Sequence, residues 1–226
     1  MSAEPCLAVI PVKPLHIALG RLADTLTPEV RWQLQYAMLA DVLMACRRSP
    51  GIAALVVTAD PSAAALARRE RAEVVADHAP PRGMNAAVRL GLARAATRCA
   101  ETALVLTADL PLIRSEDLAS LVRAGAGRPG ALLVPSRDGT GTNALLLNPP
   151  DVLEPELGHG SLSRHLLQAV RRACPVRCIG LPGVSLDIDT PEDLAVLMAT
   201  NSASRARRLM ESELHEHPLA AVGGFA

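Results

Sequence analysis

The chain has 226 residues, with 23 basic and 23 acidic side chains and a hydrophobic fraction of 50%. It is long enough for one well-buried domain and too short for two of ordinary size. The cancelling charges exclude any electrostatic reason to expect nucleic acid or an anionic membrane as a partner. One Trp, one Tyr and one Phe are the only aromatic rings, so the core must be aliphatic and platforms for stacking bases are scarce.

The beginning of the chain carries no targeting signal. Residues 1–5 lack the basic start of a signal peptide, and the short apolar run at 7–12 is followed at once by Lys13. No apolar run has the length of a membrane span. The five cysteines are scattered without a CxxC pair, so we expect reduced thiols. These features predict a cytoplasmic protein.

Apolar runs alternate with helical patterns along the chain, which predicts an α/β architecture. In the first half, the runs and periodicities indicate strands at 7–12, 54–57 and 73–76, and helices at 28–48, 62–71 and 84–96. Thr27 and Pro28 are typical of an N-cap and of the first helical position. Trp32 and Tyr36, four residues apart on this helix, are typical of packing or of a subunit contact, so a homodimer is one expected assembly.

In the second half, the same patterns indicate strands at 103–107, 131–135, 143–147, 176–181 and 185–189, and helices at 116–124, 161–173 and from 191 onward. Ser115 is expected to cap the helix at 116–124. Residues 190–193 (TPED) carry the capping-box pattern that begins the last core helix. We expect a single domain over residues 1–200, followed at 201–226 by a surface helix and a flexible tail.

Aspartates stand at two places where strands are expected to end. Asp109 follows a strand of pure hydrophobics, so its carboxylate is expected at the carboxyl edge of the sheet, where open α/β sheets bind ligands. Asp187 and Asp189 flank Ile188, and alternate residues of a strand share one face. Three converging carboxylates require a cation, and hard oxygen ligands favour Mg²⁺. The alternative is that Asp109 opens a turn and Asp189 precedes a helix cap.

Two glycine-containing segments are candidates for binding a small anionic molecule. Gly158 and Ser161 stand just before a helix, whose amino terminus attracts anions. Residues 139–143 (GTGTN) offer hydroxyl groups, the Asn143 amide and a flexible backbone. Together they fit a molecule that carries phosphate and carboxylate groups. The alternative is two ordinary loops, one of them with a serine cap.

The segment after the first strand holds Lys13, the only lysine of the chain, and Arg21. A cationic loop at this place commonly cradles phosphates, although neither GxxxxGK[ST] nor GxGxxG occurs. Gly83 and Asn85 open a helix and are candidates for contact with a nucleobase or ribose, with a simple turn as the alternative. The sequence contains no HExxH, no GxSxG and no credible nucleophile triad.

Taken together, these segments resemble the 2-phospho-L-lactate guanylyltransferase family of deazaflavin coenzyme F(420) biosynthesis. The matching stretches include IPVKPL at 10–15, VVTADP at 56–61, ADLP at 108–111, GTGTN at 139–143 and LDIDTPED at 186–193. They follow one another in order from about residue 7 to residue 199. The resemblance implies a three-layer α/β nucleotidyltransferase fold of the glycosyltransferase-A kind, with a mixed, mainly parallel sheet.

The resemblance also implies transfer of GMP from GTP to a small phosphorylated acid (2-phospho-L-lactate, phosphoenolpyruvate or 3-phosphoglycerate), with release of pyrophosphate. By position, three carboxylates would hold Mg²⁺: Asp109, Asp187 and Asp189. Three residues would bind the acid: Asn143, Gly158 and Ser161. Lys13 and Arg21 would approach the nucleotide phosphates and neutralise the charge that builds up on the leaving pyrophosphate.

One departure from the family pattern concerns the phosphate loop. Residues 18–22 read ALGRL, where members of the family usually read AKSRL. Leu19 replaces a cation, which predicts weaker nucleotide binding than in the resembled family. Two alternatives remain open: another transferase of the same fold, such as a molybdopterin guanylyltransferase or a sugar-nucleotide enzyme, and a catalytically silent nucleotide-binding regulatory member.

Overall fold

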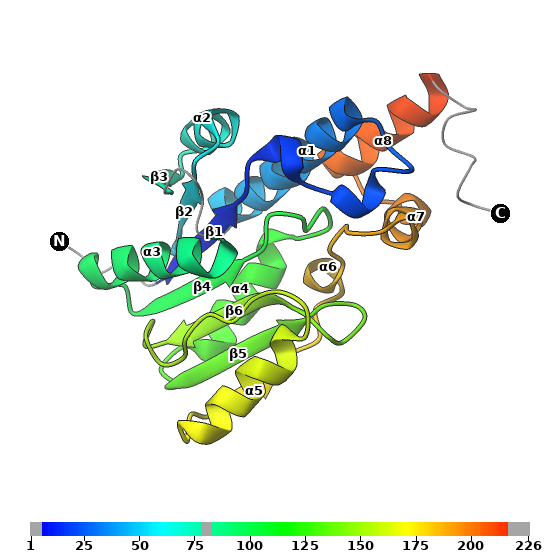
Figure 1. The fold of residues 1–226 in the computed structure, drawn as a ribbon. Coiled ribbons are helices and arrows are strands. Elements are labelled where there is room, and N and C mark those ends of the chain that lie inside the picture. The colour runs from blue at the N-terminus through cyan, green and yellow to red at the C-terminus, as the bar shows by residue number, and fades with distance from the viewer. Residues whose placement is uncertain (1–5, 78–82, 217–226) are drawn as a thin grey trace.

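The computed structural model describes residues 6–77 and 83–216. Its centre is one seven-stranded sheet in the order β3-β2-β1-β4-β6-β5-β7 (Figure 1). The strands are β1 (Cys6–Val12), β2 (Ile52–Thr58), β3 (Glu73–Ala76), β4 (Thr102–Leu106), β5 (Gly130–Pro135), β6 (Thr142–Asn148) and β7 (Val176–Cys178). β6 is antiparallel to β4 and β5, and the other pairs are parallel. The sheet is therefore mixed and mainly parallel, as predicted.

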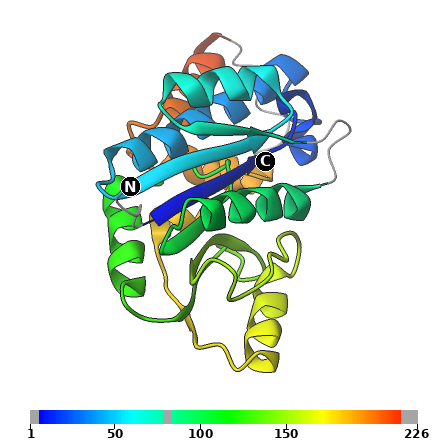
Figure 2. The same ribbon diagram turned by 90° about the vertical axis from the view of Figure 1, so that its left-hand side faces the viewer.

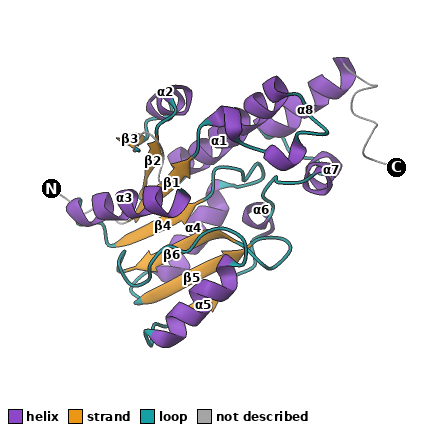
Figure 3. Ribbon diagram, viewed as in Figure 1, coloured by secondary structure: helices purple, strands orange, loops and turns teal. Residues whose placement is uncertain are grey.

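Helices cover both faces of this sheet and make three layers (Figures 1, 2 and 3). They are α1 (Pro28–Arg48), α2 (Pro61–Arg69), α3 (Met84–Thr97), α4 (Ser115–Gly125), α5 (Ser161–Arg171), α6 (Pro182–Ser185), α7 (Pro191–Ala199) and α8 (Arg205–Glu216). α1, α2 and α4 pack on one face, and α3 and α5 on the other. None of the helices in the described part of the chain has the length and hydropathy of a membrane span.

The first strand shows why the layers form. Every residue of β1 is buried, and successive side chains point to opposite faces. Ile10 packs in the cluster under α1, whereas Val9 packs in the cluster under α3. Trp32 and Tyr36 stack with ring centroids 5.2 Å apart and pack against the α1 side of this core. The two rings therefore serve packing within the chain.

A second apolar cluster lies beyond the sheet, where the short 3₁₀ helix η2 (Gly20–Leu22) meets α1, α7 and α8. Asp41 on α1 accepts hydrogen bonds from the backbone N–H groups of Arg205 (3.0 Å) and Ala206 (3.1 Å), which docks the start of α8. Ala206 and Met210 are then buried in the cluster. The helix expected on the surface therefore contributes one face to a core. The expected tail, residues 217–226, lies outside the described residues.

Three expectations about individual elements were wrong. Residues 185–189 do not form a strand: Ser185 ends α6, and the segment after it pairs with none of the described strands. Its backbone bond to the edge joins Ile188 N–H to Asp109 C=O at 3.2 Å. Arg114, and not Ser115, is the N-cap of α4, since Asp117 accepts from the Arg114 N–H at 3.0 Å. β7 ends at Cys178, earlier than predicted.

Leu19 belongs to the second cluster. It adopts a left-handed conformation (φ 55°), and only 8% of it is exposed. Its aliphatic side chain packs with Leu22 and Ile188, so the residue that replaces the family's cation is a packing residue in this chain.

Leu19→Lys is expected to lower the free energy of unfolding by about 2 kcal/mol, because a packed apolar side chain is replaced by an ammonium group that must reach water. Thermal and urea unfolding measure the change. Gly20→Ser is the matched control, since a Cβ there meets nothing within 4 Å and the unfolding midpoint should stay constant. An unchanged midpoint for Leu19→Lys together with tighter nucleotide binding would contradict the packing role.

Candidate functional site

The carboxyl edge of the parallel strands carries the candidate site. Lys13 follows β1, Asp109 lies just beyond β4, and Arg137 follows β5. Because β6 runs the other way, its second residue, Asn143, lies at the same edge. Segments far apart in the sequence therefore meet at one end of the sheet.

A cavity of about 390 Å³ opens at this edge. Four predicted polar residues line it: Lys13, Arg21, Asp109 and Asp189. Ile17, Leu19 and Met84 provide apolar walls. Gln35, which the sequence reasoning missed, donates from Nε2 to the Ala108 carbonyl oxygen at 3.1 Å. This bond fixes the backbone immediately before Asp109.

Asp109 is the most perturbed carboxylate of the site. Its pKa is raised to about 7, mainly by burial, with smaller contributions from the carboxylates of Asp187 and then Asp189. Its Oδ1 atom is buried and has no hydrogen-bond partner among the described residues. A buried carboxylate with neighbouring negative charges is electrostatically suited to a bound cation.

Asn143 positions Asp187. Its Nδ2 atom lies 3.0 Å from three acceptors: Val184 O, Ser185 O and Asp187 Oδ1. Burial raises the pKa of Asp187, and the bond from Asn143 opposes that rise. The donors of Asn143, predicted to bind the acid, are thus engaged with the 184–187 segment. The Asn143 amide therefore holds the Asp187 carboxylate in place, although Asp187 does not belong to a strand.

Two ion pairs flank the aspartates. Arg21 Nη1 lies 3.4 Å from Asp189 Oδ2, with 68% and 48% of the two side chains exposed. Arg137 Nη2 donates to Asp193 Oδ1 at 2.7 Å, and Asp193 also caps α7 through Thr190. Arg137 was not among the predicted site residues. Its position two residues beyond the end of β5 is the signal that could have found it.

The three aspartates are electrostatic neighbours, but they do not form a closed ligand set. Among the described residues, no three His, Cys, Asp or Glu side chains are placed to hold a metal ion together. The donor chemistry nevertheless fits Mg²⁺, because all three offer carboxylate oxygens and Asp109 Oδ1 has no described partner. Magnesium binding by Asp109, Asp187 and Asp189 stays a prediction.

The loop between β5 and β6 is held by its own hydrogen bonds. Asp138 accepts from Ser136 Oγ (2.5 Å), Thr140 N (2.9 Å) and Thr140 Oγ1 (2.8 Å). These bonds lower the pKa of Asp138 to about 2. Gly141 N donates to Ser136 Oγ at 2.7 Å. The hydroxyl groups that we expected to face a ligand from a flexible backbone therefore stabilise the loop itself.

The turn before α5 engages the backbone donors of Ser161 and Leu162 within the protein. Gly158 has φ 110°, which favours glycine, and its carbonyl oxygen accepts from Ser161 N at 3.0 Å. Leu162 N donates to Thr140 O at 3.1 Å. The Ser161 hydroxyl is buried, and its Oγ has no partner among the described residues. Ser161 Oγ is thus a side-chain group of this turn without a partner among the described residues.

Asn85 fastens the segment before this turn to α3. Its Oδ1 accepts from Leu157 N at 2.7 Å, and its Nδ2 donates to Leu157 O at 3.3 Å. Both ends of the amide are engaged, and Asn85 does not line the cavity beside Asp109. Gly83 is exposed directly before α3, with nothing within 4 Å of its Cβ position. Met84, between them, is the residue that reaches the cavity.

His165 joins three segments from a fully buried position. Glu156 N–H donates to its Nε2 at 3.0 Å, so Nδ1 carries the proton and donates to Thr142 Oγ1 at 3.1 Å. Burial lowers the pKa of His165 to about 4, with a smaller contribution from Arg164. The neutral ring thereby ties α5 to the start of β6 and to the loop before the turn.

Comparison with known families gives a match over most of the chain. The profile of the family described as "Guanylyl transferase CofC like" matches residues 6–214. A phosphoenolpyruvate guanylyltransferase of Sphaerobacter thermophilus is 41% identical over 192 residues, which are 84% of this chain and 91% of that protein. The protein of the same name from Conexibacter woesei is 38% identical over 222 residues, 93% and 97% of the two chains.

Solved structures agree with the fold. A Desulfovibrio desulfuricans protein described as a nucleotide-diphospho-sugar transferase superposes with a TM-score of 0.75 at 15% identity, covering 93% of this chain and 95% of that one. A cytidylyltransferase from Leptospira borgpetersenii gives a TM-score of 0.56 at 16% identity, with 99% of each chain covered. At these identities the likeness concerns the fold alone, and it confirms the predicted nucleotidyltransferase architecture.

The pH dependence of stability tests His165. Its lowered pKa stabilises the fold fully above the unfolded value of about 6.5, and this contribution is lost as the pH falls toward about 4. The difference in free energy of unfolding between wild type and His165→Gln is expected to shrink by about 2–3 kcal/mol between pH 7 and pH 4. His159→Gln, in the exposed turn, is the control and should follow the wild-type curve. If the free energies of unfolding of wild type and His165→Gln changed in parallel with pH, His165 would not be a buried neutral ring with a lowered pKa.

Proposed function

Because the chain belongs to the CofC-like guanylyl transferase family, and is thus a nucleotidyltransferase, we propose that it transfers GMP from GTP to a small phosphorylated carboxylic acid. The products are pyrophosphate and a guanylylated acid. The observation that carries this proposal is the cavity at the sheet edge, which Lys13 and Arg21 line together with Asp109 and Asp189. Cations suit the nucleotide phosphates, and carboxylates suit a divalent metal ion.

The reaction needs no covalent intermediate and no general base on the protein. A phosphate oxygen of the acid is already an anion, so it can attack the α-phosphorus of GTP directly. The bond from the α-phosphorus to the bridging oxygen breaks, and that oxygen leaves with pyrophosphate. The work of the protein is therefore alignment and neutralisation of developing charge.

Lys13 and Arg21 are the residues that would neutralise the leaving pyrophosphate. Lys13 is exposed directly after β1 and lines the cavity, where its ammonium group can contact a phosphate group. Arg21 is held by Asp189 but remains largely exposed, so it can contact a phosphate from the same position. When bound by Asp109, Asp187 and Asp189, Mg²⁺ would add neutralisation at the triphosphate.

The acid is proposed to lie between the aspartates and the turn before α5. Ser161 Oγ is buried in that turn without a described partner, and a ligand oxygen would satisfy it if the turn opens on binding. Gly158 itself carries no side chain, and the nearest atom to a Cβ there would be Arg164 Nη2 at 3.9 Å. Arg164 is thus a cation close to the place proposed for the anion.

Phosphoenolpyruvate is the acceptor that we propose first, since the relatives that cover most of this chain bear its name. 2-Phospho-L-lactate and 3-phosphoglycerate share the phosphate and carboxylate groups and are the competing acceptors. The product would serve deazaflavin coenzyme F(420) biosynthesis. A cytoplasmic location is part of the proposal, consistent with the free cysteines, of which Cys6 and Cys46 are buried.

Pyrophosphate release tests the function. GTP, ATP, CTP and UTP are each offered with phosphoenolpyruvate, 2-phospho-L-lactate or 3-phosphoglycerate in the presence of Mg²⁺. GTP with phosphoenolpyruvate is expected to give the highest kcat/KM, and excess chelator should abolish it. Asp109→Asn should lower turnover about a hundredfold or more while the fold is kept. Absence of pyrophosphate with every pair would make the chain a silent binding protein.

Ser161→Ala tests the acceptor site. The buried hydroxyl has no partner to lose among the described residues, so the unfolding midpoint should stay constant. The KM of the acid is expected to rise about three- to tenfold, the size of one neutral hydrogen bond, with the KM of GTP unchanged. Ser163→Ala, an exposed position on the same helix, is the control. An unchanged acceptor KM would remove Ser161 from the site.

A further inference from the structure

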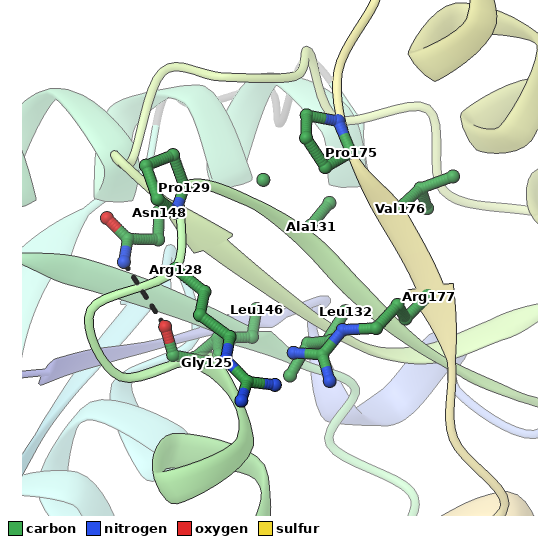
Figure 4. A pocket seen from close by; sticks show the side chains of 11 residues that line it. Gly125, Arg128, Pro129, Ala131, Leu132, Leu146, Asn148, Pro175, Val176 and Arg177 are labelled. Atoms are coloured by element: carbon green, nitrogen blue, oxygen red, sulfur yellow. Dashed lines mark hydrogen bonds between the residues drawn. The ribbon is translucent and has the colours of Figure 1, made fainter.

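A second cavity lies at the opposite edge of the sheet from the aspartates. Its volume is about 380 Å³. The end of α4, the first residues of β5, the last of β6 and the start of β7 surround it (Figure 4). Asp109 and Lys13 stand at the carboxyl ends of β4 and β1, on the other edge of the sheet. The second cavity shares no lining residue with the candidate active site.

The walls of the second cavity are closely packed. Gly130 has φ 134°, and a Cβ there would come within 2.3 Å of the Pro175 carbonyl oxygen. That oxygen accepts from Ala131 N at 2.9 Å, which joins β5 to the residue before β7. Asn148 Nδ2 donates to Gly125 O at 3.3 Å and closes the side toward α4 (Figure 4). The cavity is therefore bounded by backbone that leaves little room for collapse.

Two arginines reach into this space. Arg177 comes from β7, and its Nη2 donates to the carbonyl oxygen of Ala124, which anchors the guanidinium at the end of α4. Arg128 comes from the turn after α4, whose backbone is fixed by the bond from its N–H to Gly125 O at 3.1 Å. Figure 4 shows the two guanidinium groups extending from opposite sides toward Leu132.

The charge of these arginines is not balanced locally. No acidic residue lines the cavity, and within residues 6–77 and 83–216 no ion pair to Arg128 or Arg177 occurs. Beneath the guanidinium groups the lining is apolar, formed by Leu132 and Leu146 with Val176 at the side. Two uncompensated cations above an apolar floor define a binding site of mixed character.

We propose that this cavity is a second anion-binding site, which takes a small molecule with a phosphate or carboxylate group on a compact apolar body. The anion would lie between Arg128 and Arg177, and the apolar body over Leu132 and Leu146. The planar guanidinium fork suits both phosphate and carboxylate oxygens. The site is separate from guanylyl transfer and does not depend on that proposal.

Titration of the full chain with n-butyl phosphate and with pentanoate, followed by amide NMR, tests the site. Saturable shifts are expected at Ala131, Leu132 and Val176 for at least one of the two anions. Inorganic phosphate, which lacks the apolar body, and butanol, which lacks the anion, should each bind at least about fivefold more weakly. The stronger of the two organic anions identifies the head group.

Arg128→Gln is the deciding variant, because its side chain has no described partner and its removal leaves the fold intact. Affinity for the better anion is expected to fall about five- to tenfold, less than for a fully buried pair because solvent screens the site. Arg177→Lys keeps a cation and should retain part of the affinity. Arg123→Gln, an exposed arginine of α4 that faces Ser120, is the matched control.

Several results would overturn the proposal. Shifts confined to the surroundings of Lys13 and Asp109 would assign the anions to the active site. Equal affinity for inorganic phosphate and butyl phosphate would remove the apolar floor from the argument. Equal weakening by Arg128→Gln and Arg123→Gln would show a general effect of surface charge. The absence of any saturable shift at Leu132 would show that neither anion binds in the cavity.

Discussion

The main constraint on the candidate site is electrostatic: the fold holds carboxylates that repel one another at one edge of its sheet. Asp109 stands in the least solvated position, and its raised pKa reflects burial first and the charges of Asp187 and Asp189 second. Such an arrangement is unfavourable in the free protein and becomes favourable when a cation or a proton compensates it. Much of the surrounding structure holds these acids close to one another against that repulsion.

The residues that do this are mostly neutral donors and cations outside the reacting groups. Asn143 fixes Asp187 and the backbone of α6, Gln35 fixes the backbone before Asp109, and Arg21 pairs with Asp189. Arg137 reaches Asp193 and ties the loop after β5 to the start of α7. Each of these bonds restrains one carboxylate or its backbone. The neutral donors and cations thus orient the individual carboxylates, although the described side chains do not by themselves form a closed metal site.

The packing of the phosphate loop links the site to the end of the chain. Leu19 and Leu22 share one apolar cluster with Ile188, which stands between two of the site aspartates, and with Ala206 and Met210 of α8. Asp41 anchors α8 on α1. A residue that the resembled family uses as a cation has become part of this core. The loop thereby has a fixed apolar anchor at this position instead of a charge.

The sequence by itself determined the alternation of strands and helices, the N-cap of α1, the capping box of α7 and the position of Asp109 just beyond a strand. These features follow from local preference and periodicity, which short stretches of chain carry within themselves. The sequence also predicted that Ile188 is buried while Asp187 and Asp189 face away from the core. This alternation holds in the structure although the segment is not a strand. Only the tertiary structure decided that residues 185–189 lie at the sheet edge without pairing as a strand, that the amides of Asn143 and Asn85 bond to distant backbone, and that Leu19 is core. Those outcomes depend on which partners meet across the fold, and a side chain's hydrogen bonds to distant residues leave no periodic trace in the sequence.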